Sequence, residues 1–189
     1  IDGTSISTSV NDYAAWASLR MSAPLVLLHV LDKSEYPART DLSGNIGLGS
    51  REALLHELAE LDEKRGKIML EQGRLMLETA RQRAIDDGIA NPIVHQRHGS
   101  LLDSLVAIEE DTRLLVLGKH EESLGEHIGS RLETLARTLH RPMLIATAEF
   151  KTPERIMIAY DGSATAHKVL DTVSGSPLFQ GLPCHVVMV

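Results

Sequence analysis

The chain repeats the opening of its own fold 159 residues later. Residues 1–30 align with residues 160–189 without a gap, and seven positions are identical, among them Asp2 with Asp161 and Gly3 with Gly162. Both copies carry an Asp-Gly turn, a stretch with helical spacing and an apolar run, in that order. A fixed offset of this kind indicates a duplicated structural unit. We therefore predict one nearly full repeat followed by the start of a second.

The repeat divides the chain into residues 1–148, a polar linker at 149–154 and residues 155–189. A chain of 189 residues can bury one complete core but hardly two. The first repeat holds only the last residue of its opening strand, and the second stops at its second strand. We therefore expect part of a tandem two-domain protein. The alternative is a short protein whose extra strands complete a neighbouring copy by swapping.

Apolar patterning predicts alternating strands and helices within the first repeat. Uninterrupted apolar runs are typical of strands buried on both faces of a sheet, and spacings of three and four indicate helices. With Ile1 as the end of an opening strand, the order β-α-β-α-β-α-β-α-β predicts an α/β fold, a five-stranded parallel doubly wound sheet. The predicted strands span 24–31, 92–96, 113–118 and 141–148, and the predicted helices span 6–21, 51–87, 100–110 and 130–140.

The predicted helix at 51–87 is longer than a small domain can cover. At about 1.5 Å per residue it would extend about 55 Å. Gly66 and Gly73, seven residues apart, are therefore either bend points or a face for close packing.

Composition excludes several classes of function. The formal net charge is −7 and no basic run occurs, so we expect no nucleic-acid partner. No apolar stretch approaches the roughly 18 to 20 residues that span a bilayer, and no charged leader precedes an apolar segment. We therefore expect a cytoplasmic protein without a membrane partner. The single cysteine, Cys184, falls on an apolar run and is predicted to be a small buried hydrophobe. No His or carboxylate motif has metal-ligand spacing, so no metal is predicted.

Ligands of doubly wound sheets bind at the carboxyl ends of the strands. That rule points to Asp2, Val30, Gly118 and the loop that follows Gly118. Asp2 and its equivalent Asp161 could accept hydrogen bonds from a ligand, or could cap their own turns. The loop "GKHEESLGEHIGS" ends at a predicted helix N-terminus, which favours an anion. A glycine turn capped by Ser130, without any ligand, would produce the same sequence pattern. Three glutamates in the loop would also repel a phosphate.

Several motifs together resemble the universal stress protein family. They are the strand-Asp-Gly-Ser/Thr corners at 1–4 and 157–163, "LLHVLD" at 27–32, "LLVLG" at 114–118, Gly129-Ser130 before a helix, and "RPMLIA" at 141–146. The offset of 159 resembles the tandem form of the family. The resemblance implies a five-stranded parallel sheet that pairs through its last strand, so self-association or pairing of tandem halves is expected through residues 141–148.

The resemblance also implies an ATP site. Adenine and ribose contacts would fall on Asp2, Val30 and Leu117, and phosphate contacts on Gly118, Gly129 and Ser130. In the second repeat, Asp161 and Val189 are the matching positions. ATP-binding members carry a further glycine where this chain has Glu121, and only seven residues separate it from Gly129. That departure predicts a degenerate phosphate loop.

These inferences favour a stress-response protein that acts by binding rather than by catalysis, with an adenine nucleotide as its candidate ligand. Two alternatives stay open at this stage. One is a slow ATPase or phosphotransfer protein that uses Asp2 and Ser130. The other is a structural dimerisation module without a ligand.

Overall fold

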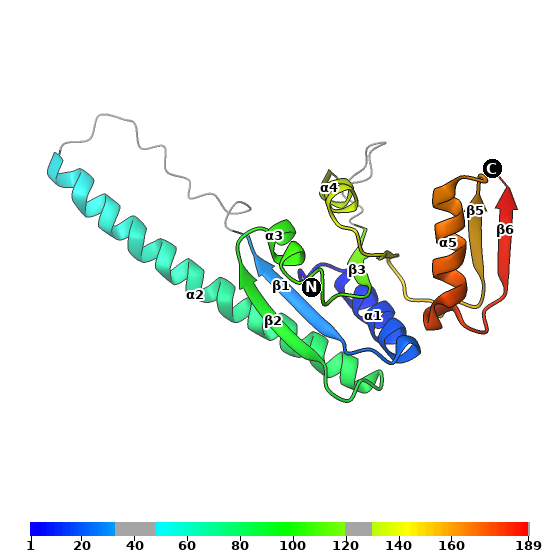
Figure 1. Ribbon diagram of the computed structural model, residues 1–189. Helices are drawn as coiled ribbons and strands as arrows, with labels where there is room; N and C mark the ends of the chain where they lie inside the picture. Colours follow the sequence, from blue (N-terminus) through cyan, green and yellow to red (C-terminus); the bar gives the residue numbers. More distant parts are fainter. Residues whose placement is uncertain (33–47, 120–129, 189) are drawn as a thin grey trace.

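Parallel strand pairs, each linked through a helix, organise the chain (Figure 1). The computed structural model describes residues 1–32, 48–119 and 130–188. In these ranges β1 pairs with β2, β3 with β4, and β5 with β6, and all three pairs are parallel. The predicted α/β class with parallel strands is confirmed. The five strands of one continuous sheet are not observed among the described residues, where each sheet has two strands.

The first pair forms a βαβ unit around a long crossover helix. The elements are α1 (Ser7–Met21), β1 (Val26–Leu31), α2 (Leu48–Asp86) and β2 (Ile93–His98). Val26 lies opposite Ile93 and Leu31 opposite His98. Small side chains let α1 pack closely against α2, which also packs against β1. The buried core comprises Ala14, Ala15, Leu25, Leu27, Leu77, Ala80, Ala84 and Ile89.

The second pair is built from shorter elements. They are α3 (Leu101–Val106), β3 (Leu115–Gly118), α4 (Ser130–Thr138) and β4 (Met143–Ala146). Ser100 caps α3, because its hydroxyl accepts a hydrogen bond from the Asp103 backbone N–H. The buried cluster of this unit consists of Leu105, Leu115, Leu135 and Leu139.

The third pair repeats the opening βαβ pattern. It contains β5 (Ile156–Tyr160), α5 (Ala164–Gly175), a short 3₁₀ helix η2 (Pro177–Phe179) and β6 (Cys184–Met188). Arg20 of α1 links this unit to the first repeat, since its Nε donates to the carbonyl of Leu178 at 2.7 Å. The prediction of a buried Cys184 is wrong, because β6 is exposed along its length and Cys184 with it. In this unit the helix α5 packs against β5 and leaves β6 uncovered.

The two Asp-Gly corners have the same local geometry. Gly3 has φ +75° and Gly162 has φ +77°, a left-handed conformation that side chains disfavour. The backbone N–H of Thr4 donates to Asp2 Oδ1 at 3.1 Å, and that of Ser163 donates to Asp161 Oδ1 at 2.9 Å. The equivalence inferred from the repeat therefore holds at the level of the turn.

The long helix is unbroken. α2 runs 39 residues without a bend at Gly66 or Gly73. Gly73 instead lies against the sheet: an added Cβ would be 2.6 Å from a His29 ring carbon and 2.3 Å from the Gln96 side-chain nitrogen. Of the two sequence-based interpretations, close packing applies to Gly73. Among the described residues, no helix combines the length and apolarity that crossing a bilayer requires.

Candidate functional site

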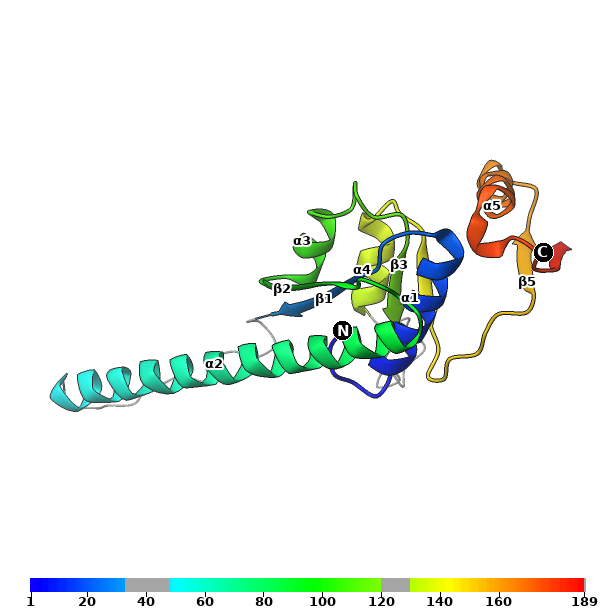
Figure 2. The ribbon, with the colours of Figure 1, turned by 90° about the horizontal axis from the view of Figure 1, so that it is seen from below.

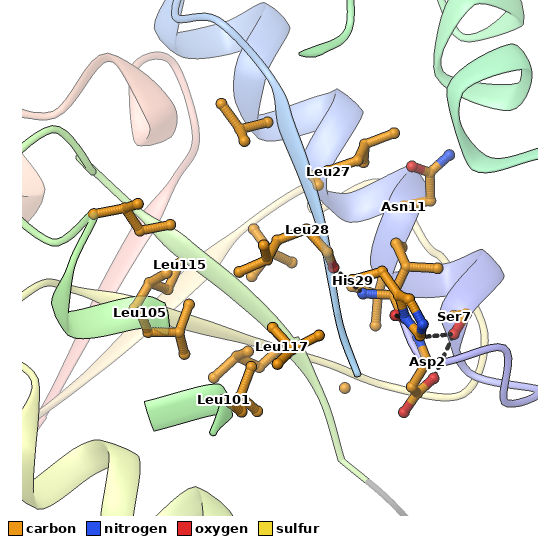
Figure 3. Close-up of a pocket in the computed structure, with 18 of the residues that line it drawn as sticks. Asp2, Ser7, Asn11, Leu27, Leu28, His29, Leu101, Leu105, Leu115 and Leu117 are labelled. Atoms are coloured by element: carbon orange, nitrogen blue, oxygen red, sulfur yellow. Dashed lines mark hydrogen bonds between the residues drawn. The ribbon is translucent and has the colours of Figure 1, made fainter. Parts of the chain in front are cut away.

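A groove separates the first two strand pairs. β1 pairs with β2 on one side, and β3 pairs with β4 on the other, which leaves the facing edges of β1 and β3 without a ladder partner in the described part of the chain. A cavity of about 1630 Å³ lies there, lined by residues of α1, β1, α2, α3, β3 and α4 (Figure 3). That volume exceeds the roughly 300–1,000 Å³ of typical ligand pockets.

Four of the predicted site residues meet at this groove. Asp2, Val30, Leu117 and Gly118 all line it, where β1 and β3 end. The other four predicted site residues are not among the described residues that line the groove. Ser130 begins α4, Asp161 lies at the corner of the second repeat, and Gly129 and Val189 lie outside the described residues.

One carboxylate oxygen of Asp2 accepts the hydrogen bonds that fix the side chain, and the other accepts none within the described residues. Its Oδ1 accepts hydrogen bonds from the Thr4 hydroxyl at 2.7 Å, the Ser7 hydroxyl at 2.6 Å and the Thr4 backbone N–H at 3.1 Å. Partial burial by itself raises the pKa of Asp2, but the hydrogen bonds from Ser7 and Thr4 outweigh it, so the pKa lies below its usual value. None of the hydrogen bonds in the described residues uses Oδ2. The carboxylate is therefore ionised and fixed in orientation, with one acceptor oxygen left for a ligand.

Gly118 has a packing reason that is independent of any ligand. A Cβ at this position would lie 2.9 Å from Ile6 Cγ2 and 3.0 Å from Val10 Cγ2. Only glycine lets α1 approach the end of β3 this closely without displacing those side chains. Lys119, the next residue, also lines the groove and supplies a positive charge at the strand end.

Sequence reasoning missed two buried polar side chains of the groove. His29 Nδ1 lies 2.7 Å from the carbonyl oxygen of Ile1, which can only accept, so Nδ1 carries the proton. Within the described ranges, His29 Nε2 and Asn11 Oδ1 are both buried without a hydrogen-bond partner. The Asn11 side-chain nitrogen Nδ2 donates to the Ala80 carbonyl. A histidine inside the apolar run "PLVLLHVL" was the available signal for His29. Among the described residues, no group of His, Cys, Asp and Glu side chains could hold a metal ion.

Comparison with known proteins identifies the family. The model of the universal stress protein family matches residues 1–147. The chain is 33% identical over 193 residues to the universal stress protein Slr1230 of Synechocystis sp. (strain ATCC 27184 / PCC 6803 / Kazusa), an alignment that covers the whole chain and 67% of that protein. The sequence-based resemblance is confirmed by both findings.

Solved structures add to the description of the fold. A universal stress protein crystallised in complex with cAMP is 17% identical, with a TM-score of 0.50 over 79% of this chain and 94% of that one. The structure of hypothetical protein MJ0577 is 19% identical, with a TM-score of 0.47 over 76% and 92% of the two chains. At 17% identity, the likeness to the cAMP complex concerns the α/β fold alone. The family match and the cyanobacterial relative together establish that this chain belongs to the universal stress protein family.

Proposed function

We propose that the carboxyl ends of β1 and β3, beside Asp2, bind an adenine nucleotide weakly and without turnover. The observation that carries the proposal is that Asp2, Val30, Leu117 and Gly118 all line one cavity where β1 and β3 end. The fixed, ionised carboxylate of Asp2 offers Oδ2 as an acceptor for a ribose hydroxyl or an amino group. The apolar side chains of Val30 and Leu117 near these strand ends suit the flat face of a base. The relative crystallised with cAMP supports an adenine nucleotide as the ligand class.

The sequence of the loop after β3 favours a ligand with few phosphates. Glu121, Glu122 and Glu126 repel a polyanion, and the loop lacks the middle glycine of ATP-binding members. Gly118 serves the packing of α1, so its presence alone is no evidence for a phosphate cradle. We therefore expect ATP to bind with a dissociation constant weaker than roughly 100 μM, or about −5.5 kcal/mol. AMP and cAMP, with less negative charge, bind at least as tightly.

Calorimetry on the whole chain tests this proposal. ATP, AMP and cAMP are titrated separately into the wild type and into Asp2→Asn and Asp171→Asn. Asp2→Asn is expected to weaken binding at least about fivefold, because a hydrogen bond to a charged acceptor is lost. Asp171→Asn, which changes an exposed aspartate of α5 outside the candidate site, is the control and leaves binding unchanged. Low-micromolar ATP binding refutes the degenerate site. No binding of any of the three nucleotides at millimolar concentration refutes the nucleotide ligand, and ATP turnover lost in Ser130→Ala supports the phosphotransfer alternative.

We also propose that one further strand lies in the groove and joins the two observed strand pairs into one sheet. The Ile1 nitrogen donates to the Leu28 carbonyl at 2.7 Å, which is the first rung of a ladder along the free edge of β1. In the second repeat, β5 occupies the equivalent place beside β6, with Tyr160 opposite Met188. A strand that ends at Ile1 would fill the groove between β1 and β3 and join four described strands into five.

Placing a copy of residues 155–159 (Arg-Ile-Met-Ile-Ala) directly ahead of Ile1 tests the strand. The added strand pairs on both edges and buries two isoleucines, so the urea midpoint is expected to rise, since each buried isoleucine contributes about 1.5–3 kcal/mol. The matched control carries proline in place of the central methionine, which removes a ladder N–H. Equal stability of the two insertions refutes the arrangement.

Self-association through residues 141–148 is the remaining part of the proposal. β4 pairs with β3 along one edge, and its other edge has no partner in the described ranges. A second sheet could extend from that edge, as the tandem form would require. Sedimentation of Leu144→Pro tests it, with circular dichroism to show that the variant is folded. A folded variant that associates like the wild type refutes this interface.

A further inference from the structure

The first half of α2 extends beyond the sheet that its second half covers. Gly73, Leu77, Ala80 and Ala84 are buried on one side of the helix, whereas the residues before Gly73 are largely exposed. Both views show this half of α2 projecting away from β1 and β2 (Figures 1 and 2). A projecting helix of this length has little tertiary packing, so its exposed face has to be explained by something other than the core.

That face carries an apolar stripe with a seven-residue period. A seven-residue period keeps side chains on one face of a helix and is the pattern by which two helices pack together. Leu58 lies between the first two members of the stripe and extends it. The stripe consists of Leu54, Leu61, Ile68 and Leu75, which are 37%, 56%, 59% and 52% exposed.

Charges along the same stretch divide into two blocks. Residues 54–63 carry four acidic side chains and no lysine or arginine, whereas residues 64–75 carry four basic side chains and one acidic. A parallel pair of such helices would place acidic block against acidic block. An antiparallel pair places the acidic block of each helix against the basic block of the other, which is favourable.

We propose that α2 pairs antiparallel with α2 of a second copy of this chain, through the stripe formed by Leu54, Leu61, Ile68 and Leu75. The midpoint of the stripe lies between Lys64 and Arg65, one residue from the boundary of the charge blocks. A twofold axis at that point makes apolar and charge complementarity coincide, as an isologous dimer requires. Leu61 and Ile68 also border the groove, but the pairing does not depend on any ligand there.

Sedimentation velocity of the whole chain measures the pairing. The wild type is expected to associate, and Leu61→Glu with Ile68→Glu is expected to raise the dissociation constant at least about tenfold, because two buried apolar contacts become charged. Val106→Glu, an exposed apolar residue of α3, is the matched control and leaves association unchanged. Both variants change only exposed side chains, so both are expected to fold, and circular dichroism verifies this. A monomeric wild type, or a double variant that associates as the wild type does, overturns the proposal.

Disulfide trapping tests the orientation. In a Cys184→Ser background, Leu54→Cys and Leu75→Cys chains are mixed and oxidised. These positions lie about 31 Å apart along one helix, so the two orientations cannot be confused. The antiparallel pair gives the mixed disulfide and little of either homodisulfide. Homodisulfides alone indicate a parallel pair and overturn the proposal, and so does the absence of any disulfide under conditions in which the chains associate.

Discussion

Replacing Asp2 by alanine removes the hydrogen bonds that organise the turn before α1. Three donors, the Thr4 N–H, the Thr4 hydroxyl and the Ser7 hydroxyl, converge on Oδ1. Removing a capping acceptor of this type costs about 0.5–2 kcal/mol. The contacts lie at an exposed corner, where solvent can replace them, so we expect a loss of about 1–2 kcal/mol rather than the sum of three charged hydrogen bonds.

Urea unfolding followed by tryptophan fluorescence measures this loss. Trp16, the single tryptophan of the chain, lies in α1, the helix that the turn precedes. With a urea slope of about 2 kcal/mol per molar, the midpoint falls by about 0.5–1 M. Asp161→Ala is the matched control: its carboxylate accepts from the Ser163 N–H in the other repeat, so the Trp16 transition is unchanged.

Acid titration gives an independent check of the same reasoning. The pKa of Asp2 is lower in the folded chain than its ordinary value, so its contribution to stability is present above the unfolded pKa and is lost as the pH falls through the folded pKa. The difference in unfolding free energy between wild type and Asp2→Ala is therefore constant near neutral pH and shrinks below about pH 4. A difference that is absent at pH 7, or that does not shrink in acid, refutes the assignment of these hydrogen bonds to an ionised Asp2.

Four further substitutions test the packing. Leu77→Ala leaves a cavity in the core between α1, α2 and β1 and is expected to lower the unfolding free energy by about 2–5 kcal/mol in urea denaturation. Gly66→Ala, with open space around its Cβ, raises the helicity and thermal stability of α2 by about 1 kcal/mol, whereas Gly73→Ala meets the His29 ring and lowers stability in the same melting experiment. Gly118→Val forces α1 away from β3 and costs about 1–3 kcal/mol, measured by the same denaturation.

Local patterns were sufficient to predict the strands and helices, but not the way in which they join. The apolar run before Asp32 and the spacing of α1 predict β1 and α1 within two residues, because periodicity is a local property. The exposure of Cys184 could not be predicted, because it depends on which layers cover β6. The roles of Gly66 and Gly73 likewise look identical in sequence and differ only because Gly73 lies on His29 while Gly66 lies on the projecting half of α2.

The candidate site divides in the same way. The corner residue Asp2 was predictable, because a strand followed by Asp-Gly places a carboxylate at a carboxyl edge. His29 and Asn11 were not, because their unpartnered atoms result from tertiary packing and leave only the weak signal of a polar residue in an apolar stretch. Gly129 and Val189 lie outside the described residues, so their assignment stays a prediction.

The geometry of Asp2 shows how a structural residue can also serve a ligand. Its Oδ1 accepts three hydrogen bonds from the turn, and this anchoring sets the direction of Oδ2 before any ligand arrives. A preorganised acceptor loses little conformational entropy on binding. Gly118 has no second role of this kind, since its missing side chain is already required by Ile6 and Val10. Selection for packing alone would therefore retain the glycine after phosphate binding was lost, whereas the ribose side of the site persists with the fold. On the proposed function, the first repeat would recognise the nucleoside and bind triphosphate poorly, and the ratio of AMP to ATP affinity tests this directly.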